Sequence, residues 1–170
     1  MKRDSSGVLP YTDSKPQGAA DFYFAINATF RFLLDSQPGG AWEDYLEQLG
    51  REYFAPVNSA WKEEGLPMVA EYWRAFFGAE PGSEVVVEEG EGRVEIDVKV
   101  CPAIRHFRTQ GRCPVSRYCE HCEILGQARA RAAGMGMSLV GGNGSCRHTY
   151  FEDPDEAPAR VPGSICEATL

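Results

Sequence analysis

Apolar residues recur at helical spacing near the start of the chain. Between residues 22 and 34 they fall three or four positions apart, which places them on one face of an α-helix. Ser14-Lys15-Pro16-Gln17 has the form of a capping box with a proline in the first turn, so the sequence predicts that this helix begins there. Pro38-Gly39-Gly40 ends the run.

The same period continues through the rest of the first half. A second amphipathic run covers residues 42–53 and ends before Pro56. A third run covers residues 57–77 and is interrupted at Gly65 and Pro67. The pattern therefore predicts three helical regions, the last of them in two pieces.

Further along, the apolar period changes from 3.6 to 2, which predicts β-strands. Residues 85–87 and 94–100 are separated by a glycine-containing turn and form one predicted hairpin. Residues 135–140 and 145–151 form a second, joined by Gly141-Gly142-Asn143-Gly144. The backbone amides of this turn could bind an anion, but no helix or lysine follows it, so we interpret it as a hairpin turn.

Two helices are predicted between the hairpins. Cys101-Pro102 opens a short one, and residues 115–133 read as a longer one that ends at Gly134. Helices followed by hairpins predict an α+β fold, in which a helical N-terminal half packs on a small antiparallel sheet with cysteine-bearing helices. We expect one domain over residues 1–151, with a helical part (14–80) and a Cys/His-rich part (84–151). Asp, Glu, Pro and Ala dominate residues 152–170, which predicts a mobile tail.

Composition and charge restrict the class of protein. The chain has 170 residues, 43% of them apolar and 11% aromatic, which is enough for a globular core without disulfides. Its net charge of −8 argues against nucleic-acid and anionic-membrane surfaces. Polar Asp4-Ser5-Ser6-Gly7 follows Met1-Lys2-Arg3, where an exported protein would have an apolar run, so we expect a cytoplasmic location.

Four of the cysteine and histidine residues form a predicted metal-ligand set. Cys119 and Cys122 are three positions apart on a predicted helix and share a face, while His121 is turned away from them. Cys146 and His148 alternate on a predicted strand and also share a face. Together they suit zinc or another thiophilic metal ion. A disulfide between two of the cysteines, or reduced cysteines in the core, remain alternatives.

A separate thiol could be a nucleophile. Cys101 precedes Pro102 at a predicted helix start, so its sulfur occupies the N-cap, where the helix dipole favours a thiolate. His121 is the candidate base, and Arg105 and Arg117 are candidates for holding a substrate carboxylate. The alternatives are a cysteine that merely ends a strand and arginines that form a solvated basic face.

The C-terminal half resembles the L-2-amino-thiazoline-4-carboxylic acid hydrolase family. The resemblance rests on Val-Cys-Pro-Ala-Ile at residues 100–104, Tyr-Cys-Glu-His-Cys at 118–122 and Gly-Ser-Cys-Arg-His at 144–148, and it covers about residues 98–151. A looser similarity connects the chain to vinyl-reductase-type ligand-binding domains, which end in a comparable cysteine-bearing hairpin.

The resemblance implies that water opens a cyclic, amidine-like thiazoline ring, and it extends to Cys101, Cys119, Cys122 and Cys146. Two positions depart from the family pattern. Cys122 stands where many relatives have an acidic residue, and His148 stands where an aromatic residue is usual. Both departures make the site more similar to a metal-ligand set.

Three functions follow as expectations. The first is a hydrolase that acts on a small carbon–nitrogen or carbon–sulfur compound through a metal-bound water or the Cys101 thiolate. The second is a non-catalytic domain that binds a small molecule or a metal and reports it to a partner. The third is a structural zinc site. The expected partner is a small molecule rather than nucleic acid or a membrane, and a homo-oligomer is compatible with the sequence.

Overall fold

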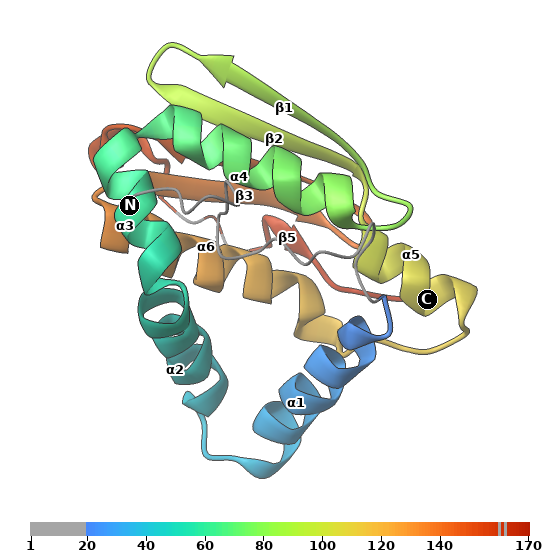
Figure 1. Ribbon diagram of the computed structural model, residues 1–170. Helices are drawn as coiled ribbons and strands as arrows, with labels where there is room; N and C mark the ends of the chain where they lie inside the picture. The colour runs from blue at the N-terminus through green and yellow to red at the C-terminus, as the bar shows by residue number, and fades with distance from the viewer. Residues whose placement is uncertain (1–19, 160, 162) are drawn as a thin grey trace.

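The computed structural model describes residues 20–159, 161 and 163–170, and its first half is helical (Figure 1). The elements are α1 (Phe22–Ser36), α2 (Ala41–Gln48), a π-helical turn η1 (Leu49–Tyr53), α3 (Ala55–Glu64) and α4 (Leu66–Ala79). The three predicted helical regions are therefore confirmed within this part of the chain. The predicted capping box at residues 14–17 lies outside the described residues.

Prolines and glycines set the boundary between α3 and α4. Gly65 has a φ of 74°, in the region that favours glycine, and it divides the third helical region into these two helices. Pro56 and Pro67 lie in the first turns of α3 and α4, where a missing backbone N–H breaks no helical hydrogen bond. The interruption predicted at Gly65 and Pro67 is thus a helix boundary.

The second half contains a five-stranded sheet in the order β1-β2-β4-β3-β5. Its strands are β1 (Glu84–Gly90), β2 (Arg93–Val100), β3 (Gly136–Gly142), β4 (Ser145–Phe151) and β5 (Ile165–Cys166). All neighbours are antiparallel except β3 and β5, which pair in parallel. Both predicted hairpins are confirmed, and the fold belongs to the α+β class.

The predicted long helix over residues 115–133 is divided in two. Residues Ser116–Cys119 form a short 3₁₀ turn, η2, and α6 (Glu120–Ala133) follows it and ends at Gly134, whose φ is 80°. The predicted short helix is α5 (Pro102–Thr109), with Cys101 at its N-cap. No helix in the described part of the chain is both long and apolar enough to cross a membrane.

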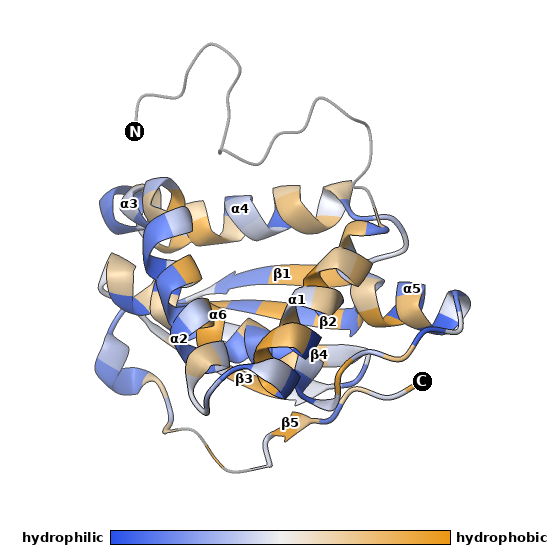
Figure 2. Ribbon diagram, turned by 90° about the horizontal axis from the view of Figure 1, so that it is seen from below, coloured by the Kyte–Doolittle hydropathy of each residue, from blue (hydrophilic) through white to orange (hydrophobic). Residues whose placement is uncertain are grey.

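One face of the sheet is buried under helices. Helix α4 contacts β1, β2 and β4, and α6 contacts β3 (Figure 1). Ile96, His148 and Leu139 pair across β2, β4 and β3 and are all buried, whereas their strand neighbours Asp97 and Arg147 face outward. Orange and blue segments alternate accordingly along β2 in Figure 2.

Helix α6 separates two apolar cores. One core lies between the sheet, α3, α4 and α6, and includes Trp61, Tyr72 and Tyr150. The other lies among α1, α2, α5 and α6, and includes Phe30, Trp42 and Phe107. Cys101 packs against both cores, so the cysteine-bearing region lies at their junction.

The C-terminal segment, which composition predicts to be mobile, packs on the domain at two points. Strand β5 pairs with Gly141 and Gly142 of β3. Beyond it, the amide of Ala168 donates to the Ser116 carbonyl at 2.8 Å, and Ala168 is buried in the second core. Thr169 also exchanges hydrogen bonds with the Asn143 side chain, and Ile165 packs against the first core. The acidic composition of the tail gives no indication of these contacts, because each depends on a partner far away in the sequence.

Candidate functional site

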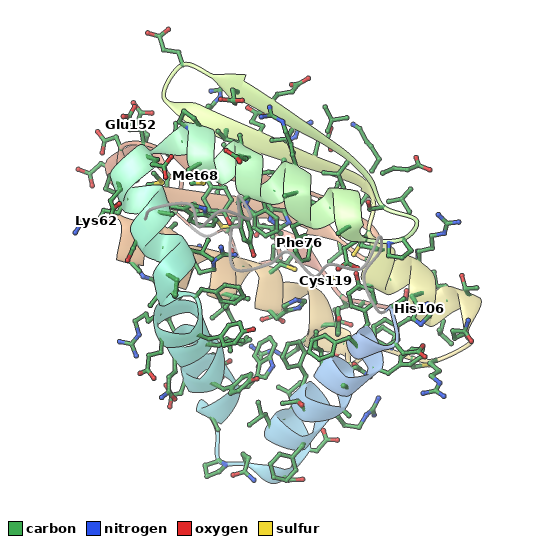
Figure 3. All side chains as sticks on the ribbon, viewed as in Figure 1. Lys62, Met68, Phe76, His106, Cys119 and Glu152 are labelled. Atoms are coloured by element: carbon green, nitrogen blue, oxygen red, sulfur yellow. The ribbon has the colours of Figure 1, made fainter. Side chains whose placement is uncertain are left out.

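The candidate cysteines and histidines come from four places in the fold. Cys101 caps α5, Cys119 ends η2, His121 and Cys122 lie in the first turn of α6, and Cys146 and His148 lie on β4. The side-chain view shows Cys119 in the interior, between Phe76 and His106 in that projection (Figure 3). The four thiols are near enough for their charges to raise one another's pKa.

A tight turn brings the second hairpin to these thiols. Asn143 and Gly144 form its two-residue loop and have φ values of 52° and 116°. The amide of Asn143 donates to Cys119 Sγ at 3.2 Å, and the amide of Cys101 donates to the Gly144 carbonyl at 2.8 Å. The Gly-rich segment is thus the predicted hairpin turn, and its backbone holds two cysteines in place.

Each of two thiols contacts an imidazole. Cys146 Sγ lies 3.3 Å from His148 Nε2, which confirms that these two residues share a face of β4. Cys122 Sγ lies 3.4 Å from His121 Nε2. The prediction that His121 is turned away from the cysteine pair was therefore wrong for Cys122, because the imidazole ring folds back toward the neighbouring sulfur.

The ring of His121 is oriented by its surroundings. Its Nδ1 atom contacts the Tyr118 carbonyl oxygen, and the ring packs against Phe30 and Tyr118 at centroid distances of 5.1 and 4.9 Å. A carbonyl oxygen only accepts hydrogen bonds, so Nδ1 carries the proton and Nε2 presents a lone pair to Cys122. The thiol of Cys122 is accordingly the donor in this pair.

Burial keeps both kinds of group uncharged. It raises the pKa of Cys122 to about 12, and the pKa of Cys146 is raised further, first by burial and then by the other thiols. Burial also lowers the pKa values of His121 and His148 to about 4. At neutral pH the two pairs are therefore thiol and neutral imidazole rather than thiolate and imidazolium.

Cys101 occupies the predicted N-cap but is not a thiolate. The amides of Ala103 and Ile104 lower its pKa, as expected at a helix N-terminus, yet burial outweighs them and raises it to about 11. In the described residues no histidine lies within hydrogen-bonding distance of its sulfur. The prediction of a reactive thiolate at Cys101 therefore differs from the structure in protonation state, although the position is confirmed.

Within the predicted metal-ligand set, only Cys146 and His148 contact each other in the described residues, because Cys122 pairs with His121, which lies outside that set. As the side chains lie, no group of three or more Cys, His, Asp or Glu residues within 20–159, 161 and 163–170 is arranged to hold a metal ion. Cys119 is tied to the Asn143 amide, and Cys122 to His121. All the cysteines are free thiols, so none of them forms the disulfide that the sequence left open.

The two arginines predicted to hold a carboxylate are engaged elsewhere. Arg105 Nη1 donates to the Gly82 carbonyl at 3.1 Å. Arg117 forms ion pairs with Glu43 at 2.7 Å and Glu120 at 3.0 Å. Among the described residues, neither guanidinium group makes a hydrogen bond to one of the thiols.

The sequence analysis missed the buried arginine of α6. Arg129 is only 2% exposed and lies among the aromatic side chains of α3 and α4. It is seven positions after Cys122, with Gly126 between them, so the three residues share one face of the helix. That spacing was the available signal, but the surrounding Ala-Arg-Ala-Arg-Ala run resembles an ordinary exposed helix surface.

Two grooves are prominent on the surface of the described residues, and neither is lined by a candidate cysteine. One, of about 460 Å³, lies between α1 and α5 and includes Cys113. The other, of about 580 Å³, lies between α4 and β1 and is lined in part by Trp73. The indole ring of Trp73 also packs edge-on against the ring of His148, with 5.8 Å between the ring centroids, so this second groove adjoins the site.

No protein-family model matches the chain, and no curated protein or solved structure matches it either.

Proposed function

We propose that this protein is a hydrolase of a small molecule with a carbon–nitrogen or carbon–sulfur bond, and that Cys122 is its nucleophile. One observation carries the proposal: His121 contacts Cys122 Sγ through Nε2 at 3.4 Å and the Tyr118 carbonyl through Nδ1. Nucleophile, base and orienting group thus form one line of contacts, which is the arrangement of activated cysteine nucleophiles. The family resemblance of residues 98–151 supports the same reaction class.

The proposed reaction proceeds through a covalent intermediate. The Cys122 thiol attacks the electrophilic carbon of the substrate as its proton passes to His121 Nε2, forming an S–C bond. The carbon–nitrogen bond then breaks, and His121 returns the proton to the leaving nitrogen. A water molecule attacks the thioester-like carbon, with His121 accepting its proton, and the S–C bond breaks to restore the thiol. No external oxidant or reductant is required.

The protonation states support proton transfer during attack rather than before it. The pKa of Cys122 is raised to about 12 and that of His121 is lowered to about 4, so the neutral pair dominates between these values. A neutral imidazole is a base, and it needs no prior deprotonation near pH 7. The activity of the proposed enzyme is therefore expected to fall at acid pH as His121 becomes protonated.

A turnover assay with 2-amino-thiazoline-4-carboxylate tests the proposal. We expect the unmodified protein to open the ring, Cys122→Ser to lose about 10³-fold in kcat/KM, and His121→Asn to lose about 10²-fold. Cys113→Ser is the control, since Cys113 is exposed, and it should retain activity. Absence of turnover by the unmodified protein, or full activity of Cys122→Ser, would contradict the proposal.

A second candidate is binding of a thiophilic metal ion, which the two sulfur–imidazole separations favour. Zn–S and Zn–N bonds of about 2.3 and 2.1 Å at a tetrahedral angle place S and N about 3.6 Å apart. The observed separations are 3.4 Å for Cys122 with His121 and 3.3 Å for Cys146 with His148. A site that used both pairs needs side-chain rearrangement, because the described residues contain no assembled group of three ligands.

Metal content separates the two candidates. Elemental analysis of anaerobically purified protein, followed by Co²⁺ titration with thiolate charge-transfer absorption as the readout, detects a Cys/His site directly. Single substitutions of His121, Cys122, Cys146 and His148 should each lower metal content if these residues are ligands. Metal content that none of the four substitutions changes, or its complete absence, contradicts the metal candidate and leaves the nucleophile proposal standing.

A further inference from the structure

Arg129 has an unusual environment for a charged side chain. Its guanidinium carbon lies 4.3 Å from the ring centroid of Phe54, 4.1 Å from Trp61 and 4.6 Å from Tyr72, with Trp73 at 5.7 Å. Aromatic faces stabilise the cation from above and below its plane. They offer no acceptor to the N–H groups, which point outward in that plane.

One edge of the guanidinium has no protein partner. Nη1 reaches only the hydroxyl of Tyr72, at 3.5 Å. Nε and Nη2 are buried and make no hydrogen bond, and no acidic side chain within residues 20–159, 161 and 163–170 forms an ion pair with Arg129. Nε and Nη2 together form the edge that binds a carboxylate through two parallel hydrogen bonds.

Other donors surround this arginine. Trp61 Nε1, Trp73 Nε1 and the Tyr150 hydroxyl are also buried and have no hydrogen-bond partner of normal geometry, although Trp73 is close enough to Tyr150 to lower the pKa of its hydroxyl slightly against the effect of burial. The Tyr150 ring lies 5.3 Å from that of Trp61 and 6.3 Å from that of Trp73. An indole N–H can only donate, and burial raises the pKa of Tyr150, which keeps its hydroxyl protonated. A cation and several uncommitted donors favour an anion.

We propose that Arg129, Trp61, Trp73 and Tyr150 bind the carboxylate of a small-molecule ligand. A single guanidinium neutralises one negative charge, and its flat fork between aromatic faces suits a planar carboxylate. A phosphate dianion is tetrahedral and carries more charge than this one cation balances. Buried polar groups normally have partners, and a bound carboxylate gives this cluster the acceptors that the protein does not provide.

The carboxylate site adjoins the thiols, and this connection rests on the proposed function. Cys122 and Arg129 share a face of α6 and are about 10 Å apart along its axis. The space beside Gly126, between them, holds the flexible Met137 side chain, whose Cε lies 2.8 Å from the position of a Cβ added there, and the Tyr150 hydroxyl, at 3.5 Å. Trp73 lies between Arg129 and His148, since its ring centroid lies 5.8 Å from that of His148 and 5.7 Å from the Arg129 guanidinium carbon. A ligand with its carboxylate at Arg129 reaches the Cys122–His121 pair along this face when the Met137 side chain moves aside.

Tryptophan fluorescence tests the inference directly, because Trp61 and Trp73 surround the guanidinium. The full-length protein is titrated at constant ionic strength with sodium cyclopentanecarboxylate, with the neutral cyclopentanecarboxamide, and with sodium phosphate. We expect a saturable response to the carboxylate and a response at least about tenfold weaker to the amide and to phosphate. Equal binding of the amide, tighter binding of phosphate, or no saturable carboxylate response overturns the proposal.

Single substitutions test where the carboxylate binds. Arg129→Lys retains the charge but loses the fork, and we expect about a tenfold loss of carboxylate affinity. Tyr150→Phe removes one donor with little change in shape, and Trp73→Phe removes another but leaves a smaller ring. Each should weaken binding, so the site can still be tested if Arg129→Lys fails to fold. Arg131→Gln, an exposed position paired with Glu47, is the matched control and should bind normally. Undiminished binding by the folded donor variants overturns the site.

Cys122→Ser distinguishes this inference from the proposed function. It should abolish turnover but keep carboxylate binding, because the serine side chain does not alter the arginine cluster. Carboxylate binding without any turnover contradicts the hydrolase alone, whereas turnover without carboxylate binding contradicts the Arg129 site alone.

Discussion

At the scale of single residues, burial decides the chemistry of this site. The helix N-terminus favours a Cys101 thiolate, but burial outweighs that effect and raises its pKa to about 11. The same cause acts in the opposite direction on His121 and His148, whose pKa values fall to about 4. Sequence position predicted that Cys101 lies at a helix N-cap and that Cys146 lies beside His148, whereas the protonation of these groups depends on how much protein surrounds them.

The two buried histidines make the folded state sensitive to acid. Their folded pKa values of about 4 lie below the ordinary value of 6.5, so the unfolded chain binds more protons between these pH values. We expect the free energy of unfolding to fall as pH drops from about 6.5 toward 4, by up to about 3 kcal/mol for each imidazole. Urea unfolding at a series of pH values measures this.

The cysteines predict that the folded state also loses stability at alkaline pH. Raised thiol pKa values mean that the unfolded chain loses protons first once pH exceeds about 9, so the free energy of unfolding should decline above that value.

His148→Asn tests the prediction at acid pH, since it should reduce the slope of the free energy of unfolding against pH below pH 6.5. An unchanged slope in that variant would show that His148 is not held neutral by burial.

At the scale of elements, close packing around α6 depends on a glycine. A Cβ added at Gly50, in η1, would lie 2.6 Å from Ala128 Cβ and 3.2 Å from the Leu125 carbonyl oxygen of α6. These are rigid atoms, so the two elements would have to separate. The π-helical turn was not predicted from residues 42–53, because a helical period in sequence does not distinguish α from π geometry over one turn.

We expect Gly50→Ala to destabilise the protein by about 1–3 kcal/mol, because overpacking forces α6 away from η1. Gly78→Ala is the matched control: Gly78 lies in α4, and a Cβ added there meets nothing within 4 Å. That substitution should be neutral or stabilise by up to about 1 kcal/mol, through helix propensity. Thermal or urea unfolding of the two variants should therefore give opposite signs. Equal changes in stability of the two variants would contradict the close contact between Gly50 and α6.

The second hairpin offers a test of how its turn positions the thiols. Gly144 has a φ of 116°, and an added Cβ would lie 3.0 Å from Arg108 Nη1. Gly144→Ala is expected to destabilise the protein by about 1–2 kcal/mol and to speed alkylation of Cys101 and Cys119 by iodoacetamide. Gly39→Ala, at an exposed position without close neighbours, should change neither. Normal alkylation rates in Gly144→Ala would argue against a positioning role for the turn.

At the scale of the whole molecule, the C-terminal segment joins the sheet to the second core. Strand β5 pairs with β3, and Ala168 packs in the core beside η2. Removing residues 163–170 should lower the free energy of unfolding and increase the rate of Cys119 alkylation, because Cys166 lies near Cys119. Mass spectrometry of alkylated peptides measures this rate, with Cys113 as the internal control. An unaltered Cys119 rate would mean that the segment does not cover the thiol.

Local patterns predicted the elements, and long-range packing determined most of the site. The period of residues 22–77 predicted the helices, and alternation at residues 94–100 predicted β2. The pairing of Cys146 with His148 followed from strand geometry within one element. By contrast, the aromatic cage of Arg129 draws on α3, α4 and α6 together, and the tail is held by strand pairing and by hydrogen bonds between Asn143 and Thr169, which lie far apart in the sequence.

For the proposed hydrolase with its proposed carboxylate site, the rigidity of α6 determines which molecules are discriminated. Cys122 and Arg129 are held two helical turns apart by a hydrogen-bonded backbone that both cores pack against. A homologous series of carboxylates would therefore be sorted by chain length: too short a molecule leaves its reactive carbon away from the sulfur, and too long a molecule must bend. Selectivity of this kind comes from the helix backbone and would persist when individual side chains around the proposed ligand site are substituted.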